Sequence, residues 1–216
     1  VRIRVRNFAY PGYQNYQETL KLSQLLATGG RPDVVIFYDG YNNRMFDAGR
    51  LLLGDFGATS FSHINYATVV DLLAKSADIE IPPSRGVNIG RPVDPEQLAP
   101  QLVAMYRSGI DLAQHLAKGY GFTVIHTYQP DIFAKRLEGD EDKVLQAFGY
   151  DDQMVRAERK LSTEVRKTMP PEVVDLSDVF DDTREPVMAN LVHTNEQGAV
   201  IIADAIWPLV EPHVTN

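Results

Sequence analysis

The chain has 216 residues, 44% of them hydrophobic and 23% charged, which is typical of a single globular domain. Its formal net charge of -8 argues against nucleic acid or an anionic membrane as the main partner, because binding phosphate groups needs a basic surface. The chain has no cysteine, which excludes disulfides and thiolate chemistry, and no apolar run approaches the ~20 residues needed to span a bilayer.

The first part of the chain alternates strand patterns with a helix pattern. Residues 1–8 alternate apolar with charged side chains and predict an opening strand, which a Pro-Gly turn ends. Residues 17–30 carry leucines at helical spacing and finish on two glycines, so they predict a helix. The short β-branched run at 32–40 is typical of a strand buried on both faces.

The middle of the chain is less regular. Residues 44–94 are rich in Gly, Pro and Ser and are interpreted as a loop-rich insertion with one helical stretch. Asp94 followed by Pro95 is a strong helix start, and this helix is expected to run toward Lys118. The acidic run at 138–142 is interpreted as a solvated loop or first helical turn and not as a metal site.

The last part repeats the alternation of strands and helices. Residues 121–130 predict a strand, 151–170 a charged amphipathic helix, and 171–180 a last short strand. Thr194 with Gln197 predicts a capping box that opens the final helix. Strands that alternate with helices indicate a parallel sheet covered on both faces, so we expect one α/β domain over residues 1–216.

Three turns that follow predicted strands carry side chains suited to catalysis. They are "NFAYPGY" at 7–13, "YDGYNN" at 38–43 and "NLVHTN" at 190–195. In parallel sheets, reacting groups gather beyond the C-terminal ends of the strands. Each turn alone is usually structural, so the informative features are their order and their shared place at strand ends.

Together these turns resemble the motifs of the SGNH hydrolases, also called the GDSL esterase/lipase superfamily, beginning at its second motif. Gly12 matches the glycine whose backbone N–H enters the oxyanion hole, Asn42 the asparagine whose side chain donates there, and His193 the histidine of the Asp-x-x-His motif. Gln129 with Pro130, and "DLSDVF" before the last loop, are similar to one exported bacterial branch. The resemblance implies a three-layer α/β/α fold with a flavodoxin-like parallel sheet, and it implies no metal and no organic cofactor.

Acyl transfer explains why the resemblance depends on these residue types. The reaction passes through a tetrahedral oxyanion, and one preformed donor stabilises the transition state by about 3 kcal/mol. Gly12 lets the backbone approach the substrate closely, and the Asn42 amide donates without a charge that must lose its water. A histidine takes the serine proton and returns it to the leaving alcohol, which is the role that the resemblance assigns to His193.

The nucleophile of this family is not in the expected place. It is a serine in a Gly-Asp-Ser motif ahead of the glycine motif, and no serine precedes Gly12 here. The similar stretch "LLLGDFGATS" has Phe56 in place of the serine and follows Asn42, so it is interpreted as loop. Because the first strand of the family lies inside the sheet, its loss would leave backbone groups unpaired. We therefore expect this strand and its serine to lie outside these residues.

Asn190 stands where the family has the aspartate that orients the histidine. An Asn carbonyl oxygen can accept the Nδ1–H of the ring, whereas an amide NH2 facing the ring selects the unproductive tautomer. In serine proteases the equivalent substitution costs about four orders of magnitude in turnover. Asp178, Asp181 and Asp182 are nearby candidates to replace this acid, and Asn43, another departure from a family aspartate, is interpreted as structural.

The other histidines and the aromatic side chains have ordinary interpretations. His126 is expected to be a satisfied core histidine, and His63, His115 and His213 lack the spacing of metal ligands. An aromatic group near two of the turns either lines a substrate cleft or packs beneath the following helices; it comprises Tyr10, Tyr13, Phe37, Tyr38 and Tyr41.

The resemblance implies a serine esterase that hydrolyses an acyl ester, an acetyl ester on a carbohydrate being one candidate, with low turnover if Asn190 impairs the histidine. The alternative is a catalytically impaired SGNH-like module that binds a glycan or a protein. A nucleotide-binding domain is disfavoured because neither Gly-x-Gly-x-x-Gly nor a P-loop occurs. The expected partner is a small-molecule or glycan ester and not nucleic acid. The branch resemblance favours an extracytoplasmic bacterial protein, or one anchored to a membrane through a segment outside this chain.

Overall fold

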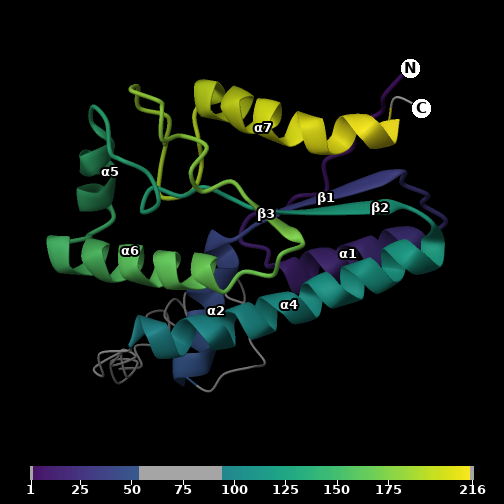
Figure 1. Cartoon of the computed structure of the whole chain (residues 1–216), viewed down its shortest axis with the longest axis horizontal. Coiled ribbons are helices and arrows are strands. Elements are labelled where there is room, and N and C mark those ends of the chain that lie inside the picture. Colours follow the sequence, from purple (N-terminus) through teal and green to yellow (C-terminus); the bar gives the residue numbers. More distant parts are fainter. Residues whose placement is uncertain (1, 54–93, 215–216) are drawn as a thin grey trace, which may run out of the picture.

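The structure is a computed structural model that describes residues 2–53 and 94–214 (Figure 1). In chain order its elements are α1 (Asn15–Ala27), β1 (Val34–Asp39), α2 (Tyr41–Leu53), α4 (Pro95–Tyr120), β2 (Thr123–Tyr128), α5 (Glu141–Ala147), α6 (Asp152–Lys167), β3 (Val173–Asp175) and α7 (Glu196–Val214). The described chain is thus a mixed α/β protein, as the alternation of strand and helix patterns predicts.

The described strands form one parallel sheet in the order β1-β2-β3. Residues of β1 and β2 pair from Val34 opposite Thr123 to Asp39 opposite Tyr128, and β3 pairs with the last three residues of β2. Because the strands point the same way, their C-terminal ends lie at one edge, from which α2 and the loops after β2 and β3 leave (Figure 1). The prediction of a parallel sheet is confirmed.

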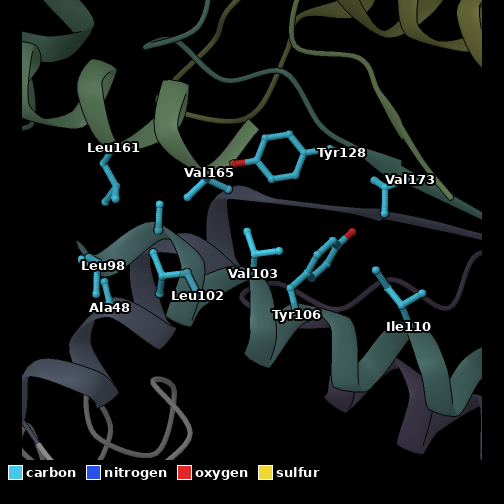
Figure 2. Close-up of a cluster of buried hydrophobic side chains, with 11 residues drawn as sticks. Ala48, Leu98, Leu102, Val103, Tyr106, Ile110, Tyr128, Leu161, Val165 and Val173 are labelled. Carbon is cyan, nitrogen blue, oxygen red and sulfur yellow. The ribbon is translucent and has the colours of Figure 1, made fainter. Parts of the chain in front are cut away.

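Helices lie on both sides of these strands. Figure 1 shows α7 on one side and α1 and α4 on the other, and α7 contacts β1 and β2 while α4 contacts β2. The largest of the buried clusters lies where α4 meets α6 and the sheet. In Figure 2, Val103 and Tyr106 of α4 lie near Val165 of α6 and Tyr128 of β2. Burying one such aliphatic side chain contributes about 1.5–3 kcal/mol, so this contact fixes α4 and α6 against the sheet.

The long helix α4 begins where its sequence signals predict. The side chain of Asp94 accepts a hydrogen bond from the Glu96 N–H at 3.0 Å, and Pro95 occupies the first turn, where its missing N–H costs nothing. The helix ends at Gly121, whose φ of 76° lies in the left-handed region that glycine adopts without strain. The helix extends two residues beyond the expected end at Lys118.

The N-terminal segment differs from its prediction. Residues 2–8 form no strand, and Val5 is 86% exposed. A strand needs a neighbour to complete its backbone hydrogen bonds, and none of the described strands pairs with this segment. The expected opening strand is therefore wrong for the described chain.

The strand β1 is confirmed, but its burial on both faces is not. Ile36, in the middle of the strand, is 43% exposed, while Phe37 is buried. Within the described residues β1 pairs only with β2, so its other edge has unpaired backbone groups. In the same way Leu20 of α1 is exposed, so only part of the leucine stripe at 17–30 enters the core.

The loop-rich insertion predicted at 44–94 begins later than expected. Helix α2 continues from Tyr41 to Leu53, so residues 44–53 are helical and not loop. The predicted helical stretch within this region, together with Phe56 and His63, lies outside the described residues.

Candidate active site

The last motif turn brings Asn190 and His193 into direct contact. The ring Nδ1 of His193 lies 3.0 Å from Asn190 Oδ1 and 2.9 Å from Asn190 Nδ2. The turn is held by an antiparallel bridge between Met188 and Thr194 and by the Ala189 N–H, which donates to the His193 carbonyl at 2.8 Å. The ring itself is exposed, so its other nitrogen can meet a substrate or nucleophile.

The backbone of the turn fixes which way the Asn190 amide points. Its Oδ1 accepts hydrogen bonds from the N–H groups of Val192 at 3.0 Å and of His193 at 2.9 Å. An amide NH2 cannot accept these bonds, so a flip of the side chain is disfavoured. In this fixed orientation either ring tautomer of His193 finds a partner: Nδ1–H donates to Oδ1, and a bare Nδ1 accepts from Nδ2. Asn190 therefore orients the ring but selects neither tautomer.

The first motif turn meets the second at Asn42. The Tyr13 N–H donates to the Tyr10 carbonyl at 3.1 Å, which closes a turn around Pro11 and Gly12, and Gly12 has a left-handed φ of 76°. The Asn42 Nδ2 donates to the Tyr13 carbonyl at 3.1 Å. Neither the Gly12 N–H nor the second N–H of this amide has a partner among the described residues. Both groups are thus available as donors for a bound oxyanion.

A chain of contacts joins the Gly12–Asn42 pair to the Asn190–His193 pair. Tyr41, the neighbour of Asn42, stacks on Phe133 with ring centroids 6.3 Å apart and an angle of 5° between the rings. The neighbouring Ile132 N–H donates to the Leu191 carbonyl at 3.0 Å. Phe133 and Ile132 belong to one buried cluster, against which Tyr41 and Leu191 pack. The loop after β2 therefore connects the two pairs.

A buried ion pair holds the loop after β2 in place. Arg44 of α2 donates to Asp131 at 2.8 Å, and both side chains are 1% exposed. The other carboxylate oxygen of Asp131 accepts from the backbone N–H groups of Phe133 and Ala134. Burial alone would lower the pKa of Arg44, but the Asp131 carboxylate and other nearby groups raise it above its ordinary value. The charged guanidinium thus fixes the loop that carries Ile132 and Phe133.

A second buried carboxylate holds the histidine turn, and sequence reasoning missed it. Glu141 belongs to the acidic run interpreted as a solvated loop or first helical turn; it does stand in the first turn of α5, but it is 1% exposed. One of its oxygens accepts from Lys135 Nζ, and the other accepts from the N–H groups of Val187 and Met188 at 2.8 and 2.9 Å. Burial alone would raise the pKa of Glu141, but Lys135 and the backbone donors lower it below its ordinary value. Nothing local distinguishes this residue from its exposed neighbours Asp140 and Asp142.

The start of α7 is a correction to the predicted cap. Asn195 Oδ1 accepts from the Gly198 N–H at 2.9 Å, so Asn195 and not Thr194 caps the helix. Gln197 donates to Glu185 at 2.6 Å instead of closing a capping box. Asn195 also donates to the Pro186 carbonyl at 2.8 Å, which ties the helix start to the segment before the histidine turn.

Asn43 is structural, as its sequence position suggested. Its side chain is buried, donates to Asn15 Oδ1 at 3.0 Å and accepts from the Asn15 N–H at 3.3 Å. The expected alternative acids do not reach the histidine: the hydrogen-bond partner of the His193 ring in the described residues is Asn190, and Asp178 pairs with Arg166 at 2.5 Å.

His126 is a core residue but not a satisfied one. It is 2% exposed and stacks on Phe37 with centroids 4.9 Å apart, and neither ring nitrogen has a hydrogen-bond partner in the described part of the chain. Burial lowers its pKa to about 4, which keeps the ring neutral. The expected aromatic group is divided: Tyr10 packs on Tyr13, while Tyr41 stacks on Phe133.

Two interacting acids, one buried and one half-buried, meet at Asp39 in the second motif turn. Asp39, at the end of β1, is fully buried, and burial followed by the charge of Glu18 raises its pKa well above the ordinary value. Burial also raises the pKa of Glu18. The charge of Glu18 thus disfavours the ionised form of Asp39, which stands in the turn that carries Asn42.

Comparisons with protein-family models, curated proteins and solved structures find no match to this chain. Across residues 2–53 and 94–214, no group of three or more histidine or acidic side chains is arranged to hold a metal ion. Within the same ranges, no helix combines the length and the apolar character that crossing a bilayer requires.

Proposed function

We propose that this chain is the body of a serine ester hydrolase of the SGNH type, with a three-layer α/β/α, flavodoxin-like fold. The observation that carries the proposal is the Asn190–His193 turn, in which a side chain three residues ahead of the exposed histidine contacts its Nδ1 and leaves Nε2 without a partner among the described residues. This is the geometry that a general base needs, because the orienting group and the reacting proton lie on opposite ring nitrogens.

The second pair supplies the oxyanion donors in this proposal. Gly12 offers a backbone N–H and Asn42 an amide N–H, and both lack a partner among the described residues. Two neutral donors held by a turn and a helix start suit the negative charge that develops on an ester carbonyl oxygen. The stacked rings of Tyr41 and Phe133 and the hydrogen bond from Ile132 to Leu191 support the proposal, because they link the two motif turns through the loop after β2.

The nucleophilic serine comes, in this proposal, from a strand outside these residues. The unpaired edge of β1, with Ile36 exposed, offers backbone groups to a further parallel strand. A serine at the C-terminal end of such a strand would lie near the motif turns, because the C-terminal ends of parallel strands lie on the same side of the sheet. The substrate class is an acyl ester, and an acetyl ester on a carbohydrate is one candidate.

A second candidate function rests on Asn190 itself. Because this amide offers a partner to both tautomers of His193, it does not select the one with a bare Nε2, and it brings no negative charge to stabilise an imidazolium. A module with such a site can bind a glycan or protein without turning it over. The two functions differ in whether the serine reacts.

The test is hydrolysis of p-nitrophenyl acetate by the full-length protein, with and without a serine-reactive phosphonate. We expect activity that the phosphonate abolishes, a loss of at least about 100-fold in His193→Ala, and a loss of about 10²–10³-fold in kcat in Asn42→Ala. His115→Ala is the matched control, because this histidine is exposed on α4 and bonds only the backbone of its own helix. Phosphonate-insensitive or absent hydrolysis would refute the esterase and leave the binding module.

A further inference from the structure

A cavity of about 510 Å³ lies between helix α6 and the segment 133–137 that follows β2. Its lining from the segment includes Lys135 and Arg136, and its lining from α6 comprises Arg159, Ser162, Thr163 and Arg166. The lining holds four basic side chains and no acidic one, although the whole chain carries a net charge of -8. The cavity therefore concentrates positive charge on an acidic protein.

The cations of this cavity differ in how far they are neutralised. Lys135 pairs with buried Glu141, and Arg136 lies 3.3 Å from Glu138. Arg166 uses Nε and one terminal nitrogen to bind Asp175 and Asp178, and its remaining terminal nitrogen makes no hydrogen bond in the described structure. Arg159 has no acidic partner in the described ranges. Arg159 and part of Arg166 are thus free to bind an anion.

A buried hydroxyl points to the same conclusion. Ser162 is 2% exposed, yet its Oγ has no hydrogen-bond partner among the described residues. A buried polar group without a partner costs about 1–3 kcal/mol, so such groups are normally satisfied by protein, water or ligand. Ser162 lies one turn from both Arg159 and Arg166 on α6, and all three line the cavity.

We propose that this cavity binds a small molecule through an oxyanion group, either a phosphate or a carboxylate, held by Arg159, Arg166 and Ser162. The guanidinium fork matches the two oxygens of such groups, and a hydroxyl donor completes their coordination. The volume falls within the ~300–1,000 Å³ range of small-molecule sites, so it has room for the molecule that carries the anion. This site is separate from the proposed ester chemistry and does not depend on it.

The test is isothermal titration calorimetry of the full chain at low salt, with glucose 6-phosphate, glucuronate and neutral glucose as the probes. We expect one or both anionic sugars to bind and glucose not to bind. The stronger of the two anionic probes identifies phosphate or carboxylate as the recognised group. Arg159→Gln should weaken binding by at least about tenfold, and Ser162→Ala by about threefold to tenfold, since charged hydrogen bonds are the stronger ones.

Arg156→Gln is the matched control, because it removes the same charge from an exposed position of α6 that does not line the cavity. It should change the affinity by less than about twofold. Equal weakening by Arg156→Gln and Arg159→Gln would show a general charge effect and overturn the proposal. The proposal would also be overturned if neutral glucose binds as tightly as the anionic sugars, or if none of the three probes binds to the folded chain. Ser162→Ala keeps the test meaningful if Arg159→Gln fails to fold.

Discussion

Replacing Asn190 by aspartate should change the tautomer of His193, and this can be measured whether or not the serine is present. In the structure Nδ1 lies 2.9 Å from the amide nitrogen and 3.0 Å from the amide oxygen of Asn190. Two neutral hydrogen bonds of similar length differ little in free energy, so neither tautomer dominates. A carboxylate offers acceptors at both positions, so only the tautomer with a proton on Nδ1 keeps a partner.

The size of the effect follows from the change in hydrogen-bond type. A hydrogen bond to a charged group contributes about 1.5–3 kcal/mol, which corresponds to a ratio of roughly 10 to 150 between the tautomers. Because the His193 ring is exposed and therefore screened by solvent, we take the lower end of this range. The backbone donors Val192 and His193 keep an acceptor, so the turn should retain its geometry. We expect about a tenfold enrichment of the productive tautomer.

The measurement is ¹⁵N NMR of the histidine rings at pH 8, where a bare and a protonated ring nitrogen have well-separated shifts. His115, whose Nδ1 bonds the Asp111 carbonyl, serves as an internal reference that should not move. Under the proposed esterase function, the same variant should raise kcat on p-nitrophenyl acetate by at least about tenfold and leave KM nearly unchanged. The reason is that the imidazolium forms only along the reaction path.

Two results would refute this reasoning. Unchanged ring shifts in a folded Asn190→Asp protein would mean that residue 190 does not contact the His193 ring in solution. A shift to the Nδ1–H tautomer without a rise in kcat would mean that position 190 is not the place of the triad acid.

Two further predictions concern stability and are measured by urea unfolding followed by circular dichroism. Arg44→Met should lower the free energy of unfolding by about 3–5 kcal/mol, because it leaves the buried Asp131 carboxylate without its partner. Adding Asp131→Asn should restore part of that loss. A loss below about 1 kcal/mol in Arg44→Met would contradict a buried ion pair. His126 has a pKa lowered to about 4 by burial, so the unfolded chain binds its proton first and stability falls as pH drops from about 6.5 to 4, by about 3 kcal/mol at most. His126→Phe should remove this part of the pH dependence. If the free energy of unfolding of the variant depends on pH between pH 7 and pH 4.5 in the same way as that of the original chain, the ring of His126 is not neutral and buried.

The features that sequence predicts well are those determined by neighbouring residues. The cap of α4 by Asp94 and Pro95 needs only the first turn of the helix, and Asn190 meets His193 because three residues separate them in one turn. The parallel sheet follows from the alternation of element types.

The features that sequence misses depend on contacts between distant residues. Glu141 looks like any member of an acidic run, and its burial is decided by Lys135 and by Val187 and Met188, more than 40 residues away. The alternating pattern of 2–8 is suited to a strand, but a strand forms only where a neighbour completes its ladder. For the same reason the exposed Ile36 could not be foreseen from a continuous apolar run.

The carboxylate of Glu141 ties the segment before the histidine turn to a distant part of the chain. Its hydrogen bonds to Val187 and Met188 close a loop of 46 and 47 residues, and closing a loop of that length costs roughly 3 kcal/mol of chain entropy before any contact compensates for it. Helix α5, which begins at Glu141, has only seven residues and several exposed side chains. A local opening of α5 would release the turn while the sheet stays folded. The lifetime of the Asn190–His193 turn is therefore tied to the stability of a short surface helix.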